Sequence, residues 1–99
     1  MKIYKNAKIF SVSYNEDPVV VDEDLICEVK FGEGRIVVSY KDDEGDVIYR
    51  GNEDGEGHYL LECAERDGKA SLHMFSKSEI LEGHWKEGDY RGFWRITLE

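Results

Sequence analysis

The sequence predicts an all-β fold, an antiparallel up-and-down meander of about eight strands that closes into a small barrel. Apolar and polar residues alternate along most of the chain, and Gly or Asp-Gly interrupts the alternation at roughly ten-residue intervals. No segment has the apolar spacing of a long amphipathic helix. A flat sheet would leave two unpaired edges, so we expect residues 4–14 to pair with the C-terminal strand. The alternative is a two-sheet β-sandwich.

The alternation also gives the positions of the strands. Residues 15–24, with Pro18 and several carboxylates, are expected to form a loop around a short extended segment. Asp67-Gly68 is the strongest turn signal, because a two-residue hairpin loop needs positive φ. All residues from 1–99 are expected to form one domain. The expected strands lie near 2–14 (open to a break in its middle), 25–31, 36–41, 46–50, 58–66, 69–75, 80–87 and 92–98.

Hairpin register predicts which side chains face the lumen, because a slip of one residue would turn every side chain to the other face. A turn at Asp67-Gly68 sets Cys63 opposite Leu72, and a turn through residues 88–91 sets Trp85 opposite Trp94. The inward aromatic and aliphatic side chains are then Phe10, Val12, Tyr14, Val29, Phe31, Val38, Tyr40, Tyr49, Tyr59, Leu61, Leu72, Met74, Trp85, Trp94, Ile96 and Leu98.

Charge and composition restrict the classes of partner. The chain has 99 residues, 22 of them acidic and 13 basic, and a net charge of −9. The negative net charge opposes nonspecific binding to nucleic acid or to an anionic membrane, because both partners are themselves negatively charged. The first eight residues are not followed by the apolar run of a secretory signal, so we expect a cytoplasmic protein. Cys27 and Cys63 are expected to be buried free thiols.

The C-terminal region carries a family resemblance. Leu81-Glu82-Gly83-His84-Trp85-Lys86-Glu87, followed by Gly92-Phe93-Trp94-Arg95-Ile96, resembles the Gly-x-Trp strands of calycin-type barrels, the lipocalin and avidin-like group. In lipocalins the Gly-x-Trp lies on the first strand and the chains are longer, which is a departure here. The resemblance implies a calycin-like barrel that binds a ligand, and it transfers no binding residue.

The inward aromatic side chains suggest a ligand site. Aromatic rings with polar tips around a barrel mouth can hold a small apolar or planar molecule. The alternative is a filled core, since a barrel of about eight strands is only wide enough for its own side chains. The residues expected to line the ligand site are Tyr14, Tyr40, Tyr49, Tyr59, Trp85 and Trp94.

Two outward-facing groups are further candidates. A polar surface cluster sets His73 between two glutamates, which could bind a metal or exchange protons, but solvated charge pairing between strands is the stronger interpretation. We therefore expect no metal and no cofactor. An apolar patch near one rim could contact a partner or a second copy, or could be covered by a loop. The cluster consists of Glu62, His73, Glu82, His84 and Arg95, and the patch of Leu60, Phe75 and Ile80.

Acidic loops suggest an alternative function. The segments 15–24, 42–46 and 52–56 could present carboxylates to a basic protein partner, as an inhibitor or immunity-type protein does. The sequence contains no Gly-x-Ser-x-Gly, no phosphate-binding glycine loop and no HExxH. We therefore expect a noncatalytic protein that binds a small hydrophobic ligand, with an acidic protein-interaction module or homodimer as the alternative.

Overall fold

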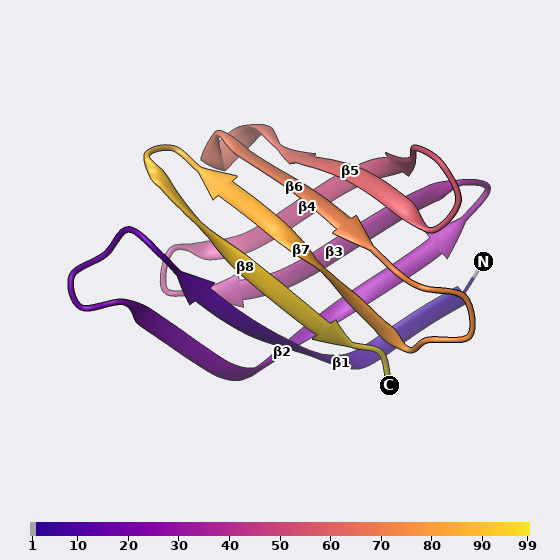
Figure 1. Ribbon diagram of the computed structural model, residues 1–99, viewed down its shortest axis with the longest axis horizontal. Helices are drawn as coiled ribbons and strands as arrows, with labels where there is room; N and C mark the ends of the chain where they lie inside the picture. The colour runs from indigo at the N-terminus through magenta and orange to yellow at the C-terminus, as the bar shows by residue number, and fades with distance from the viewer. Residues whose placement is uncertain (1) are drawn as a thin grey trace.

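The computed structural model describes residues 2–99 and shows a closed barrel of eight antiparallel strands, each paired with the next in sequence (Figure 1). The predicted fold class is confirmed, and the barrel replaces the sandwich alternative. Among these residues no helix is long and apolar enough to cross a bilayer. The elements are β1 (Lys2–Ser13), β2 (Val20–Gly32), β3 (Arg35–Asp42), β4 (Gly45–Glu53), β5 (His58–Cys63), the 3-10 helix η1 (Ala64–Arg66), β6 (Gly68–His73), β7 (Ile80–Glu87) and β8 (Tyr90–Thr97).

Pairing between the first and last strands closes the barrel. It runs from Lys8 opposite Thr97 to Ser13 opposite Gly92. The connections β1–β2, β3–β4, β5–β6 and β7–β8 lie at one end, on the left of Figure 1, which we call the mouth end. The other three connections lie at the opposite end, near the two chain termini.

A β-bulge in β1 reverses which of its side chains face inward. Tyr4 pairs with Val29 and Ala7 pairs with Cys27, so β1 has one extra residue between these two positions. The extra residue turns every later side chain of the strand to the other face. The prediction that Phe10, Val12 and Tyr14 face the lumen is therefore wrong. The residues beyond the bulge that face the lumen are Ala7, Ile9, Ser11 and Ser13.

Two hairpins differ from the expected register, the β5–β6 hairpin by four residues and the β7–β8 hairpin by two. In the β5–β6 hairpin the chain turns through η1 and through Asp67, whose φ is +50°, so Cys63 lies opposite Gly68 and not opposite Leu72. In the β7–β8 hairpin Trp94 lies opposite Gly83 and not opposite Trp85. A shift by an even number of residues moves a pair along the strand but keeps its face, so both hairpins retain the expected inward side chains.

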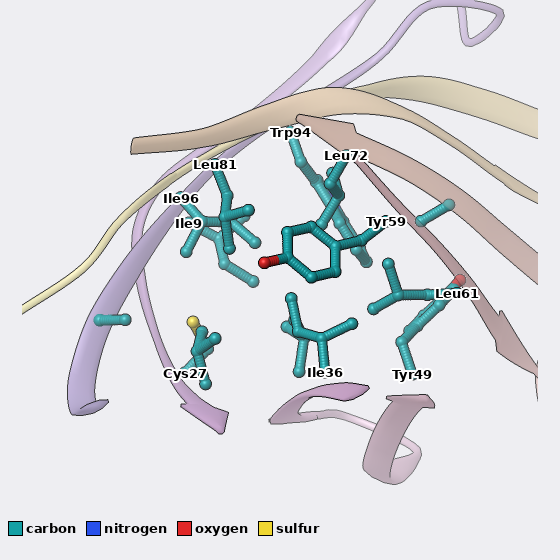
Figure 2. Packing of buried hydrophobic residues seen from close by; sticks show 14 of the residues in the cluster. Ile9, Cys27, Ile36, Tyr49, Tyr59, Leu61, Leu72, Leu81, Trp94 and Ile96 are labelled. Carbon is teal, nitrogen blue, oxygen red and sulfur yellow. The ribbon is translucent and has the colours of Figure 1, made fainter. Parts of the chain in front are cut away.

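The centre of the barrel is filled with side chains from all its walls (Figure 2). Aliphatic residues such as Ile9, Leu72 and Ile96 are completely buried. Aromatic residues flank this aliphatic layer at both ends of the lumen. Cys27 and Cys63 are buried free thiols, as expected, and burial raises the pKa of Cys27 to about 12. Of the two interpretations of the lumen, a filled core therefore describes its middle.

Candidate ligand-binding site at the barrel mouth

A hollow of about 640 Å³ opens at the mouth end because β2 and β3 separate there. In the part of the chain that the structure describes, their pairing runs from Gly32 opposite Arg35 only as far as Glu28 opposite Ser39. The first half of β2 therefore diverges from the end of β3. The hollow is lined by Ser11, Ser13, Glu16, Val20, Asp22, Glu23, Asp24, Leu25, Ile26, Tyr40, Lys41, Asp42, Asp43, Trp85, Glu87 and Trp94.

Aromatic rings form the floor of this hollow. The ring centroids of Trp85 and Trp94 are 6.3 Å apart, on the same side of the sheet, and their planes are inclined by 33°. Tyr40 and Tyr49 meet Trp94 edge to face at 6.2 and 5.0 Å. Trp94 and Tyr49 are buried, whereas Tyr40 and Trp85 are only partly covered. A planar molecule entering the hollow would meet Trp85 and Tyr40 first.

Two buried polar atoms on residues that line the hollow have no hydrogen-bond partner. They are the Oγ of Ser13, a residue only 7% exposed, and the indole Nε1 of Trp85. A buried polar group without a partner costs about 1–3 kcal/mol. A ligand that reached these atoms could supply an acceptor for the indole N–H and a partner for the hydroxyl.

Hydrogen bonds at the mouth end connect β4 to β7 and η1 to β3. The Tyr49 hydroxyl donates to Glu87 Oε1 at 2.6 Å, and Arg66 donates to both carboxylate oxygens of Asp42 at 2.8 and 2.9 Å. Burial, and then the neighbouring Glu87 carboxylate, raises the pKa of Tyr49 well above its ordinary value. Burial likewise raises the pKa of Tyr40, and the Arg66 hydrogen bonds lower the pKa of Asp42. Both phenols therefore stay neutral at neutral pH.

The structure separates the six aromatic residues expected to line the site. Tyr40, Trp85 and Trp94 line the mouth hollow, and Tyr49 packs against Trp94 beneath it. Tyr59 faces inward, but it packs against Phe31 at the opposite end, beside a separate hollow of about 540 Å³.

Tyr14 is misplaced by the expected register. It lies outside the barrel, 47% exposed, with its ring centroid 6.4 Å from that of His84.

Sequence reasoning missed the polar residues of the hollow. Ser11 and Ser13 face inward only because of the bulge in β1, and Asp22 belongs to a segment expected to be a loop. The alternation within β1 offered a signal, since Ala7 and Ile9 form an apolar alternation of opposite phase to Phe10 and Val12.

The structure brings together only some residues of the polar surface cluster. His73 lies opposite Glu82, as expected, but its other neighbour is His58 and not Glu62. Glu82 accepts a 3.3 Å hydrogen bond from Arg95 Nε, which pairs two members of the cluster.

Glu62 and His84 lie outside this pair. Glu62 is opposite Lys69, and His84 is opposite Ser71 on one side and Phe93 on the other. The register shift through η1 separates Glu62 from His73, and the shift in the β7–β8 hairpin sets His84 opposite Phe93 instead of Arg95. The five residues therefore lie on the outer face in separate pairs and form no common cluster.

The expected apolar patch is divided. Leu60 lies opposite Ser71, whereas Phe75 follows the end of β6 and packs at 4.5 Å against the ring of His73. Ile80 begins β7 opposite Thr97. All three residues are exposed, Phe75 by 66%, but the register shift places Leu60 away from the other two. A contact patch that joins the three residues is not formed.

A larger hollow, of about 950 Å³, lies outside the lumen on β4–β8. It is an open groove between two rows of outward side chains, one of which runs through Arg50, Glu62, Lys69, Lys86 and Arg91. Its charged side chains are exposed to water. Trp85 borders both hollows, but Tyr40 and Trp94 line the mouth hollow alone.

Three neighbouring cations in this outward row, Lys69, Lys86 and Arg91, lead to a prediction about stability. Lys86 lies directly between Lys69 and Arg91, and like charges in opposite positions destabilise a sheet. We expect Lys86→Glu to raise the free energy of unfolding by about 0.5 kcal/mol, because it creates two opposite-charge pairs. Urea denaturation measures the change. Lys77→Glu, with the same charge change in the β6–β7 loop, should give no such gain, and an equal gain in both variants would contradict the explanation.

The fold and this site define a class of protein, the closed up-and-down β-barrel with an aromatic-floored mouth at one end. No protein-family model, no curated protein and no solved structure matches the chain. The eight-stranded antiparallel barrel is compatible with the calycin architecture, and membership of the calycins stays a prediction. Among residues 2–99, no group of three or more His, Cys, Asp or Glu side chains has a metal-binding arrangement.

Proposed function

We propose that the protein is a noncatalytic, calycin-like barrel that binds a small planar or apolar molecule in its mouth. The observation that carries the proposal is the pair of unpartnered buried polar atoms, Ser13 Oγ and Trp85 Nε1, on residues lining an aromatic hollow. Ligand sites are concave, mostly apolar, and have a few polar groups that fix orientation. The hollow is concave and has an aromatic floor, although its rim is more polar than that of most such sites, and its volume lies within their usual range.

The aromatic floor favours a planar ligand. Trp85 and Tyr40 are partly accessible, and both are supported from below by the buried Trp94. Such support lets an aromatic ligand stack or meet a ring edge without first ordering the site. The filled middle of the barrel limits the depth of entry, so the ligand occupies the mouth and not the whole lumen.

A neutral planar probe tests this function. We expect 9-anthracenemethanol to bind one site per chain and to raise the melting temperature, because it binds the folded state alone. Trp85→Leu should weaken this binding at least about tenfold, since it removes both the ring and the indole donor. Tyr14→Leu is the matched control outside the barrel and should leave the dissociation constant unchanged. Unchanged binding in the Trp85 variant would refute the site.

The second candidate function is an acidic protein-interaction module. The β1–β2 and β3–β4 loops both border the mouth and carry carboxylates such as Glu16 and Asp43. Such a surface suits a basic partner and would give association that weakens with salt. A pulldown that recovers a basic protein at low salt would support this function, and the partner would then compete with 9-anthracenemethanol for the mouth.

A further inference from the structure

We infer that the ligand of the mouth hollow is a planar organic cation. This inference rests on the proposed function, and it adds the sign of the ligand's charge. The side chains that line the hollow include seven carboxylates, from Glu16 to Glu87, and one cation, Lys41. The Lys41 ammonium lies 4.0 Å from Asp46, a residue outside the hollow's lining. The charge around the hollow is therefore strongly negative.

Asp22 projects on the lumen side of the sheet. It lies directly opposite Ser11, and Ser11 in turn lies opposite Trp94. Residues opposite each other in a sheet share a face, so Asp22 is on the same face as the buried indole of Trp94. A carboxylate on the inner face of a barrel is costly unless it is solvated or paired. Its position at the open seam leaves it accessible to an incoming cation.

The carboxylates of the hollow fall into two groups. Asp42 and Glu87 are near the Arg66 guanidinium, which compensates them. Within residues 2–99, the structure shows no ion pair for the other five carboxylates that line the hollow, which are Glu16, Asp22, Glu23, Asp24 and Asp43. Four of these five come from the β1–β2 loop and from the first half of β2, so the uncompensated charge is concentrated on that side of the hollow.

The two sides of the hollow suit one ligand chemistry. An organic cation is attracted to the electron-rich face of tryptophan or tyrosine, and more strongly where water is partly excluded. A planar body would lie against Trp85 while its positive group faces Asp22. The buried Ser13 Oγ, which lacks a partner, could accept a hydrogen bond from an N–H of such a cation. A metal ion would instead need converging ligands, and no described group of residues provides them.

Three planar probes of matched shape test the sign of the charge. They are 9-aminoacridine, which is cationic at neutral pH, the neutral 9-anthracenemethanol and the anionic 9-anthracenecarboxylate. We expect 9-aminoacridine to bind about tenfold more tightly than the neutral probe at low salt, and the anion to bind more weakly than both. Raising the salt concentration should reduce the preference for the cation, because part of the hollow is open to solvent.

A matched pair of variants separates the mouth from the general charge of the protein. Asp22→Asn should weaken 9-aminoacridine binding about threefold to tenfold and leave 9-anthracenemethanol binding nearly unchanged. Glu56→Gln makes the same charge change in the loop at the opposite end, where the side chain is exposed, and should not alter the preference. Equal loss in both variants would show that net charge, and not the mouth, selects the cation, which would overturn the inference.

The outcomes distinguish this inference from the function on which it rests. If the neutral probe binds the mouth and the cation binds no better, the inference fails and the proposed function stands. A preference for 9-anthracenecarboxylate would also overturn the inference. If none of the three probes binds, the proposed function fails, and the inference fails with it.

Discussion

Gly92→Ala will destabilise the barrel by about 3 kcal/mol, because the added methyl group has no free space. A Cβ at this position would collide with the backbone carbonyl oxygen of Val12 and would lie 2.7 and 2.8 Å from two ring carbons of Trp85. Gly92 pairs with Ser13 on one side and with Trp85 on the other. The substitution therefore strains the closure between β1 and β8 and displaces the indole at the mouth.

Urea denaturation measures this effect, and Gly55→Ala is its control. Gly55 has a φ of +86°, but no atom lies within 4 Å of the position that a methyl group would occupy there, so only backbone strain of about 1 kcal/mol is expected. A similar small loss in both variants would show that Trp85 does not cover Gly92 and would contradict the described mouth.

The free energy of unfolding will fall steeply as the pH rises above about 10. Tyr40 and Tyr49 have raised pKa values in the folded state, chiefly from burial, against an ordinary value of 10.0. Between the unfolded and folded pKa values, the unfolded chain releases protons that the folded chain retains. The stabilisation from these tyrosines is therefore complete at a pH below their pKa in the unfolded chain. It is lost as the pH rises toward their pKa in the folded chain. Each retained proton contributes a slope of about 1.4 kcal/mol per pH unit.

Absorbance at 295 nm and urea denaturation across alkaline pH measure this dependence. Tyrosinate absorbance from Tyr40 and Tyr49 should appear only together with unfolding. In Tyr49→Phe the pH dependence of the free energy of unfolding should become less steep by the contribution of one proton, about 1.4 kcal/mol per pH unit. Cys27, whose pKa is raised to about 12 from an ordinary 9.0, adds to the slope from a lower pH. Ionisation of all the tyrosines in a chain that stays folded would contradict the description of these buried phenols.

The barrel could be predicted from the sequence because most errors in the predicted strand pairing are displacements by an even number of residues. The pairs are displaced by four residues in the β5–β6 hairpin and by two in the β7–β8 hairpin, so Leu72 and Trp94 still face the lumen. Such a displacement leaves the fold unchanged but rearranges the outer face. The predicted pairing of His73 with Glu62 and the predicted apolar patch are wrong for this reason.

The mouth could be predicted only in part. Trp85 and Trp94 were assigned to the interior from their alternation with polar residues. The inward positions of Ser13 and Asp22 depend on a bulge and on the separation of β2 from β3, which arise from closing the barrel. A single extra residue in β1 reverses a face, and alternation along one strand does not reveal where it is inserted.

The indole N–H of Trp85 reports most directly on ligand binding in the mouth. The chain has two tryptophans, so a ¹⁵N–¹H correlation spectrum contains two indole signals, which Trp85→Phe assigns. On titration with 9-aminoacridine, the Trp85 signal should move and reach saturation at one ligand per chain. A Trp85 signal that stays fixed while backbone amides of Lys69 and Arg91 move would place the ligand in the outer groove and contradict a binding site at the mouth.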